Sequence, residues 1–207
     1  MNYESLIFDI DGTLWDSRAL VAKGYNVQLK AEGLTQFHID AEVLKTVFGK
    51  TNTEIADILF GQLPADQRYP LLERCIERED EILHADECKI GYPKVKETLE
   101  ELVKKHRLFI VSNSQRGYPQ LCIEKMGLQG LITDHLCFGD TGTCKGETIK
   151  KIMADHNITS ACYIGDTQGD MEAADLAQIP FVYCTFGLGT PDHYCKKIDS
   201  FEQLLEL

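Results

Sequence analysis

The pattern of hydrophobic and polar positions divides the chain into two kinds of territory. Residues 1–14 and about 91–207 alternate short apolar runs with helical patterns, whereas residues 15–90 show helical patterns alone. The predicted strands are residues 6–8, 108–111, 161–164 and 181–184, with a weaker candidate at 136–138. The helices predicted between them span residues 93–105, 119–126, 147–156 and 170–177. Strands that alternate with helices predict a parallel sheet with right-handed crossovers.

The stretch from residue 15 to residue 90 predicts four helices and no strand. Each helix has its own boundary signal. The signals are Gly33 after the first helix, Asp40 and Gly49 around the second, a Thr51–Glu54 capping box for the third, and Pro70 at the start of the fourth. A strand–helix–strand unit takes about 30 residues, but the first two predicted strands lie roughly a hundred residues apart. We therefore predict a doubly wound, Rossmann-like α/β core (1–14 and 91–207) with an inserted all-helical domain (15–90).

Polar and acidic residues follow three of the apolar strands directly. They are Asp9 and Asp11 after the first strand, Ser112 and Asn113 after the second, and Asp166 and Asp170 after the third. Ligands of parallel α/β sheets bind at the carboxyl ends of the strands. If these strands are neighbours, the six side chains converge on one pocket.

The spacing of the carboxylates favours a cation site over purely local roles. Asp11-Gly12 could be a tight turn, and Asp170 could be the N-cap of a helix. However, carboxylates that repel one another become favourable beside a hard cation such as Mg²⁺, which prefers oxygen ligands. Lys145 precedes a predicted helix, where a lysine opposes the helix dipole. A solvated lysine is the ordinary interpretation, but a phosphoryl group would favour this position.

The amino-acid composition narrows the classes of molecule that this protein could bind. The 33 acidic and 21 basic residues give a net charge of −12, which argues against nucleic acid or an anionic membrane surface as a partner. No signal peptide and no apolar run long enough to span a bilayer is expected. The eight cysteines show neither zinc-site nor disulfide-framework spacing, so we expect reduced thiols and a cytoplasmic protein.

Together these motifs resemble those of the haloacid dehalogenase-like hydrolase superfamily, in its phosphoglycolate phosphatase-like branch with a helical cap. The motifs occur in order along essentially the whole chain, and Gly146 stands where many members have a proline after the lysine. They are Asp9-Ile10-Asp11-Gly12-Thr13-Leu14, Ser112-Asn113, Lys145 and Gly165-Asp166-Thr167-Gln168-Gly169-Asp170.

The resemblance implies a phosphatase that acts on a small phosphorylated metabolite. It implies that Asp9 is the nucleophile and that Asp11 is the general acid and base. Ser112 and Lys145 would contact the phosphoryl group, with Asn113 as a weaker candidate. It also implies Mg²⁺ held by Asp9, the Asp11 backbone carbonyl and Asp166, with Asp170 as a ligand or a support.

Several alternatives stay open. Lys50, in a loop between two cap helices, could reach the substrate or could be a solvated charge. A phosphosugar mutase would share the four motifs, and a non-catalytic regulatory protein could share the fold. The motifs do not select among small phosphomonoesters, and the sequence does not specify an oligomeric state. A bound cation and Lys145 would offset much of the site's acidity, so the net charge of −12 does not oppose a phosphate substrate.

Overall fold

The computed structural model describes residues 3–207 and divides the chain into two compact units. The sheet unit joins the chain up to Asp16 with Lys89–Leu207, and the helical unit is Ser17–Cys88. Each unit has its own core of buried apolar side chains.

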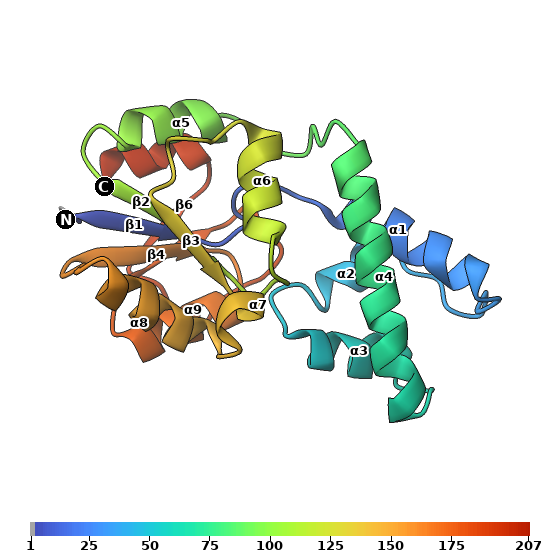
Figure 1. The fold of residues 1–207 in the computed structure, drawn as a ribbon. Coiled ribbons are helices and arrows are strands. Elements are labelled where there is room, and N and C mark those ends of the chain that lie inside the picture. Colours follow the sequence, from blue (N-terminus) through green and yellow to red (C-terminus); the bar gives the residue numbers. More distant parts are fainter. Residues whose placement is uncertain (1–2) are drawn as a thin grey trace. The chain divides into compact units, whose positions relative to one another are not determined.

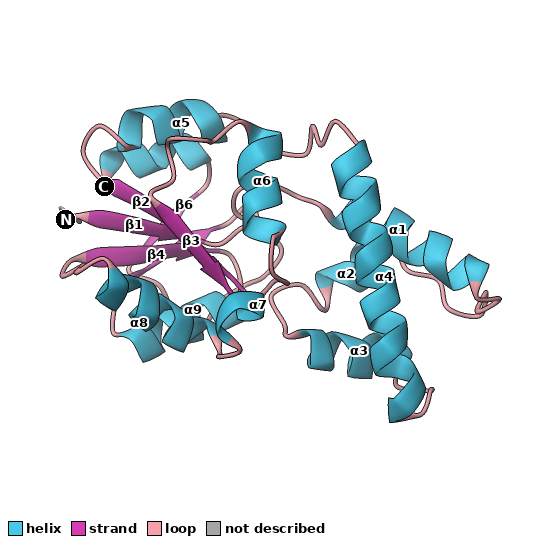
Figure 2. Cartoon of the chain, in the orientation of Figure 1, coloured by secondary structure: helices cyan, strands magenta, loops and turns pink. Residues whose placement is uncertain are grey.

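A six-stranded parallel sheet forms the centre of the sheet unit (Figures 1 and 2). Its strand order is β3-β2-β1-β4-β5-β6. The strands are β1 (Ser5–Phe8), β2 (Arg107–Ser112), β3 (Asp134–Cys137), β4 (Ala161–Gly165), β5 (Phe181–Cys184) and β6 (Lys196–Ile198). The predicted doubly wound α/β core is confirmed. β1 lies between β2 and β4, so the three strands that end in polar motifs are adjacent.

Two of the strands differ from the sequence prediction. β6 was not predicted, because it is a three-residue edge strand that contains two lysines, and short charged edges lack a hydrophobic pattern. β3 ends at Cys137, and the short helix α7 (Phe138–Thr141) follows immediately.

Helices cover both faces of this sheet. α8 (Lys145–Asp155) and α9 (Gln168–Ala177) lie together on one face, and α5 (Val95–Leu102) and η1 (Phe201–Glu206) lie together on the other (Figure 1). α6 (Tyr118–Met126) follows β2 and ends at Gly127, which has φ +66° as a left-handed C-cap. α8 begins at Lys145 itself, two residues earlier than predicted.

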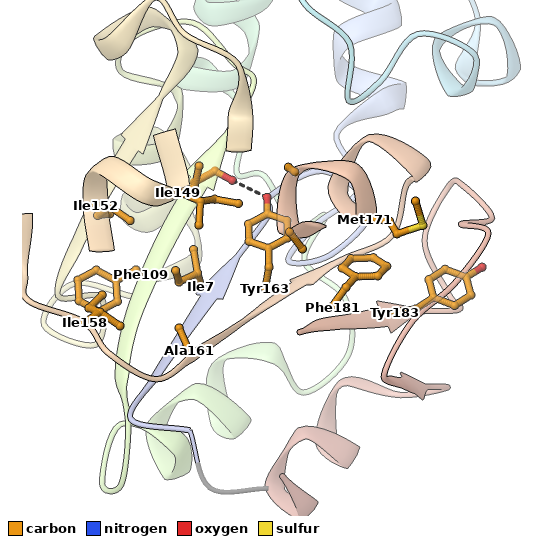
Figure 3. Packing of buried hydrophobic residues seen from close by; sticks show 13 residues of the cluster. Ile7, Phe109, Ile149, Ile152, Ile158, Ala161, Tyr163, Met171, Phe181 and Tyr183 are labelled. Carbon is orange, nitrogen blue, oxygen red and sulfur yellow. Dashed lines mark hydrogen bonds between the residues drawn. The ribbon is translucent and has the colours of Figure 1, made fainter. Parts of the chain in front are cut away.

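Apolar side chains from the strands and from α8 and α9 fill the core beneath one face (Figure 3). Ile7 of β1, Phe109 of β2 and Tyr163 of β4 are each fully buried. The Tyr163 hydroxyl, which would be costly to bury without a partner, donates a hydrogen bond of 2.8 Å to the Val111 carbonyl. This packing fixes the positions of the three strands whose ends carry the motifs.

The helical unit contains α1 (Arg18–Ala31), α2 (Ala41–Lys45), α3 (Asn52–Phe60) and α4 (Ala65–Ala85). Asp40 caps α2 by accepting hydrogen bonds from the amides of Glu42 and Val43, as predicted. The predicted Thr51–Glu54 capping box at the start of α3 is also present.

Two of the predicted helix ends in this unit are wrong. α2 ends at Lys45 and continues as turns to Gly49. α4 begins at Ala65, so Pro70 lies inside the helix instead of opening it. A proline near the start of a helix removes only one backbone hydrogen bond. The first turn is held in place by Arg68, whose guanidinium contacts the Leu63 carbonyl and forms a 2.7 Å ion pair with Asp57.

Candidate active site

Asp9 lies directly after β1, and its side chain is almost completely buried. Its backbone amide donates a hydrogen bond of 2.9 Å to the Ile164 carbonyl of β4, so the parallel ladder continues one residue beyond the strand. The chain then turns at Gly12, which has φ +87°. A Cβ atom on Gly12 would lie 2.2 Å from Asp166 Oδ2. Only glycine therefore lets the loop after β1 approach the carboxylate at the end of β4.

Asp166 follows β4 and is fully buried. Its Oδ2 accepts a 2.6 Å hydrogen bond from the Leu188 amide, and its Oδ1 lies 3.5 Å from the Thr13 hydroxyl. A Cβ atom on Gly187 would come within 2.2 Å of the Asp166 Cβ. The loop after β5 therefore packs tightly against this carboxylate and holds its orientation.

Asp170 stabilises the turn between β4 and α9. Its Oδ2 accepts hydrogen bonds from the Asp166 amide (3.1 Å), the Thr167 amide (2.9 Å) and the Thr167 hydroxyl (2.7 Å). Thr167 is the N-cap of α9, and Asp170 is the third helical residue in a capping box. The alternative in which Asp170 is itself the N-cap is therefore wrong.

Lys145 joins two of these carboxylates. Its Nζ forms ion pairs of 2.9 Å with Asp9 Oδ1 and 2.6 Å with Asp170 Oδ1, and only 4% of its side chain is exposed. A lysine is unfavourable at the first position of a helix, but here two buried carboxylates offset that cost. The surface alternative for Lys145 is wrong, since the side chain points into the site.

Burial and the excess of negative charge shift the pKa values of the site. Burial and the Asp170 charge raise the pKa of Asp9 to about 7. The pKa of Asp166 is also well above its ordinary range, because of burial and the charges of Asp170 and Asp9. Burial opposes ionisation of Asp170 as well, but Lys145 and the Thr167 hydrogen bonds lower its pKa. Burial lowers the pKa of Lys145, but the charges of Asp170 and Asp9 raise it above its ordinary range.

These residues fit a divalent cation. Asp9, Asp166 and Asp170 each offer a carboxylate oxygen, and these oxygens lie within 4.8 Å of one another. When all three are ionised, Lys145 compensates one of the three negative charges and leaves two. The raised pKa values of Asp9 and Asp166 have the same origin, since buried carboxylates without sufficient countercharge bind protons. A hard cation with oxygen ligands would supply that countercharge.

The other predicted site residues belong to different parts of the fold: Ser112 and Asn113 lie at the end of β2, and Lys50 lies in the helical unit. Ser112 is the last residue of β2, and its hydroxyl accepts a 3.3 Å hydrogen bond from the Ser114 amide. Asn113 follows it and is half-buried. Lys50 belongs to the helical unit, where it is exposed just before the Thr51 cap.

Asp11 has partners that the sequence analysis did not predict. Trp15 Nε1 and the Tyr118 hydroxyl each donate a 2.9 Å hydrogen bond to Asp11 Oδ1. Trp15 has a packing role too, through its edge-to-face contact with Tyr118. Tyr118 lies 107 residues from Asp11, so no local pattern could have indicated the pair.

Solved structures with the same fold include several hydrolases. A Bacteroides fragilis protein described as a haloacid dehalogenase-like hydrolase superposes with a TM-score of 0.84 at 25% identity, covering 98% of this chain and 100% of that one. A predicted phosphoglycolate phosphatase from Haemophilus somnus superposes with a TM-score of 0.83 at 22% identity, covering 100% and 98%. This chain therefore has the α/β fold that these proteins share.

The family profile for haloacid dehalogenase-like hydrolases matches residues 6–184, so the chain belongs to that family. Among curated relatives, the phosphoglycolate phosphatase of Aquifex aeolicus is 27% identical over 177 residues, which is 83% of this chain and 80% of that protein. The pyrophosphatase PpaX of Oceanobacillus iheyensis is 24% identical over 191 residues, or 86% and 82%. The predicted family and hydrolase class are confirmed. Over the described residues, none of the helices is long and apolar enough to cross a membrane.

Proposed function

We propose that this protein is a Mg²⁺-dependent phosphatase that hydrolyses a small phosphomonoester through an aspartyl-phosphate intermediate. The observation that carries the proposal is the buried group of Asp9, Asp166, Asp170 and Lys145, which has one cation for three carboxylates. Phosphatase relatives support the same chemistry.

Asp9 is the proposed nucleophile. One of its carboxylate oxygens attacks phosphorus, and the bond between phosphorus and the leaving alcohol oxygen breaks. Lys145, which is 2.9 Å from Asp9 Oδ1, favours the ionised form of Asp9 and offsets charge on the transferred group. Ser112 at the end of β2, with Asn113 beside it, is proposed to donate hydrogen bonds to the phosphoryl oxygens.

Asp11 is the proposed proton carrier in both steps. It gives a proton to the alcohol oxygen as that oxygen leaves. It then takes a proton from the water that attacks phosphorus, and the bond between Asp9 and phosphorus breaks. The products are the alcohol and inorganic phosphate, and both aspartates return to their initial states.

Mg²⁺ would be held by Asp9, the backbone carbonyl of Asp11 and Asp166, and when bound it would neutralise charge on the phosphoryl group. Asp170 is better placed as a support than as a ligand. Its Oδ1 is paired with Lys145, and its Oδ2 accepts the hydrogen bonds of the turn. Asp170 therefore orients Lys145 and Asp166.

The helical unit, placed as a cap domain of residues 15–90 in the sequence analysis, is proposed to select the leaving group. Within it, Lys50 is the candidate contact for an anionic or hydroxylated substrate. Small phosphorylated metabolites of the phosphoglycolate or sugar-phosphate type are the proposed substrates. Six of the eight cysteines are buried, and their spacing along the chain is not that of a disulfide framework, which supports a cytoplasmic location because thiols stay reduced there.

The decisive experiment replaces Asp9 with asparagine. Asp9→Asn keeps the size of the side chain and removes the nucleophilic oxygen, so phosphate release from 4-nitrophenyl phosphate should fall by at least about 10³-fold with an unchanged circular-dichroism spectrum. Turnover close to that of the unmodified protein would exclude Asp9 as the nucleophile.

The metal assignment has its own test. Asp166→Asn should weaken Mg²⁺ binding, measured by calorimetry, by at least about 10-fold. Asp175→Asn, in the same helix α9 as Asp170 but half-exposed and paired with His193, is the matched control and should leave Mg²⁺ affinity unchanged. Equal affinity in both variants would overturn the assignment of Asp166 as a ligand.

A panel of phosphosugars separates hydrolysis from phosphoryl transfer back to sugar. A phosphatase releases inorganic phosphate from the panel, whereas a mutase isomerises phosphosugars without net release. A protein with no Mg²⁺-dependent turnover of any phosphate ester would instead be a regulatory member of the family.

A further inference from the structure

The side chain of Asp11 is held by two aromatic donors from different parts of the sheet unit. The Trp15 indole and the Tyr118 hydroxyl both donate to the same oxygen, Oδ1, at 2.9 Å. Trp15 is fully buried and Tyr118 is 3% exposed. Their rings meet edge to face with centroids 5.6 Å apart, so each ring limits the movement of the other.

The backbone also fixes Trp15. Its carbonyl accepts a 2.9 Å hydrogen bond from the Gly12 amide, and its own amide donates to the Ile10 carbonyl at 3.2 Å. Trp15 also forms an isolated antiparallel bridge with Gly91. Tyr118 is the first residue of α6, directly after Gly117, which has φ +89°. Trp15 is therefore held by backbone hydrogen bonds and Tyr118 by the first turn of α6.

The chemistry of the two donors distinguishes the oxygens of Asp11. An indole N–H can only donate, whereas a tyrosine hydroxyl can donate or accept. Because Trp15 cannot accept a hydrogen bond, a proton on Oδ1 would oppose the indole N–H. A proton on Asp11 is therefore favoured on Oδ2, and Oδ1 is the favoured acceptor.

We propose that Trp15 and Tyr118 are positioning residues that hold Asp11 Oδ1 as an acceptor and assign proton transfer to Oδ2. This inference rests on the proposed function of Asp11 as acid and base. The proton on Oδ2 moves to the alcohol oxygen as its bond to phosphorus breaks. Oδ2 then accepts a proton from water as the water oxygen attacks phosphorus.

Two aryl phosphates of similar shape test this role. Nitrophenolate leaves without a proton donor, whereas the more basic phenolate of phenyl phosphate benefits from one. The ratio of kcat/KM for 4-nitrophenyl phosphate to that for phenyl phosphate therefore reports proton donation by Asp11. A change in the ratio separates positioning from a purely structural role, which would lower kcat/KM for both esters equally.

The variants remove single donors with little change in packing. Trp15→Phe keeps an aromatic ring beside Tyr118, and Tyr118→Phe removes only the hydroxyl. In Trp15→Phe, kcat/KM for phenyl phosphate should fall by about 10-fold more than kcat/KM for 4-nitrophenyl phosphate. Tyr118→Phe should change the ratio in the same direction by a smaller factor, because the indole donor remains.

Tyr183→Phe is the matched control. It also removes one tyrosine hydroxyl, which donates to the Gly189 carbonyl at 2.9 Å, and it should leave the ratio unchanged. Equal losses with both esters in Trp15→Phe and Tyr118→Phe would overturn the positioning role but not the phosphatase function. If the unmodified protein hydrolyses neither these esters nor any ester of the phosphosugar panel, the proposed function fails, and the positioning role fails with it.

A second measurement does not depend on turnover. Trp15 is the single tryptophan of the chain, so intrinsic fluorescence reports the surroundings of its indole. Asp11→Leu removes the acceptor and should change the emission maximum or intensity. Asp140→Leu, which removes a carboxylate bonded to Arg116 and Cys137, should leave the emission unchanged. The same emission in Asp11→Leu and in the unmodified protein would contradict the bond between Trp15 and Asp11.

Discussion

The two units bury ionisable side chains in different ways. The sheet unit buries Asp9, Asp166 and Asp170 around Lys145. The helical unit buries Glu79, which faces Tyr25. The pKa of Tyr25 is well above its ordinary range, first because of burial and second because of the Glu79 charge. A tyrosine satisfies one carboxylate by a hydrogen bond, whereas three carboxylates with one lysine keep an excess of negative charge. The contrast separates a buried charge that is matched by a neighbouring donor from a buried group that keeps an excess of negative charge.

Among the substitutions that compare the two units, the largest effect is expected from removing Lys145, the cation that pairs with Asp9 and Asp170. Lys145→Met leaves Asp9 and Asp170 without their ion pairs. Turnover should fall by about 10²–10³-fold, and the free energy of unfolding of the metal-free protein should fall by about 3–5 kcal/mol. Phosphate-release kinetics and urea denaturation measure the two effects.

Lys150→Met is the control for that substitution. Lys150 lies in the same helix α8, is exposed and pairs with Glu147 at 2.8 Å. Such surface pairs contribute less than about 1 kcal/mol, so this variant should keep its turnover. If Lys145→Met kept the turnover and the free energy of unfolding of Lys150→Met, the buried charges of the sheet unit would not differ in effect from a surface ion pair.

The pH dependence of stability should be determined mainly by the buried carboxyl groups of the sheet unit. The folded pKa of Asp9 is about 7, raised from 3.8 by burial and the Asp170 charge, and that of Asp166 is also raised. A raised folded pKa stabilises the protein at low pH, and this contribution is lost as the pH rises through the folded value. The Tm of the metal-free protein should therefore fall between about pH 4, where the unfolded carboxyl ionises, and about pH 7, the folded pKa of Asp9.

Asp170 does not reverse this trend. Its pKa is lowered, so its stabilising contribution is lost only below its ordinary range, at more acidic pH. Asp9→Asn should reduce the fall in Tm. A Tm that rises over the same interval in the unmodified, metal-free protein would show that the carboxylates are already compensated.

A smaller effect is expected from the buried pair of the helical unit. Tyr25→Phe removes a hydroxyl that is hydrogen-bonded to Glu79 and should lower the free energy of unfolding by about 1–3 kcal/mol. Turnover per folded molecule should stay unchanged, since Tyr25 lies in the core of the helical unit. Loss of turnover without loss of stability would assign a functional role to that pair.

The smallest change concerns the contact between α1 and α4. A Cβ atom on Gly24 would lie 2.8 Å from the Glu79 Cα and 3.0 Å from its amide nitrogen. Gly24→Ala should cost about 1–3 kcal/mol by overpacking, partly offset by about 0.5–1 kcal/mol of helix propensity. Thermal unfolding measures the net loss. Lys23→Ala, at the exposed neighbouring position, should instead be neutral or slightly stabilising.

Local patterns were enough to predict most elements of the sheet unit. β1, β2, β4 and β5 have continuous apolar runs because they are covered on both faces. The capping signals of Asp40 and of Thr51 with Glu54 predicted two helix starts correctly, because those hydrogen bonds form between residues two or three positions apart. β6 has no such run, and Pro70 as a start signal was wrong because contacts of Arg68 stabilise an earlier turn.

The residues of the site were predictable for a related reason. In a parallel sheet, residues that follow adjacent strands meet at one edge. The sequence therefore determined that Asp9, Asp166 and Asp170 would lie near one another, and the structure places them within 4.8 Å. Their proposed roles came from the resemblance to a family and remain to be tested by the substitutions above.

The tertiary structure alone decided how each of these charges is held. The sequence does not indicate that Leu188 donates to Asp166, that Asp170 pairs with Lys145, or that Tyr118 contacts Asp11. These partners lie 22, 25 and 107 residues apart. Their contacts depend on the packing of loops and helices around the sheet. A hydrogen bond forms only over a narrow range of donor–acceptor distances, so both partners must be placed accurately. The sequence determined which residues meet at the edge of the sheet, and tertiary packing determined which groups hold each carboxylate there.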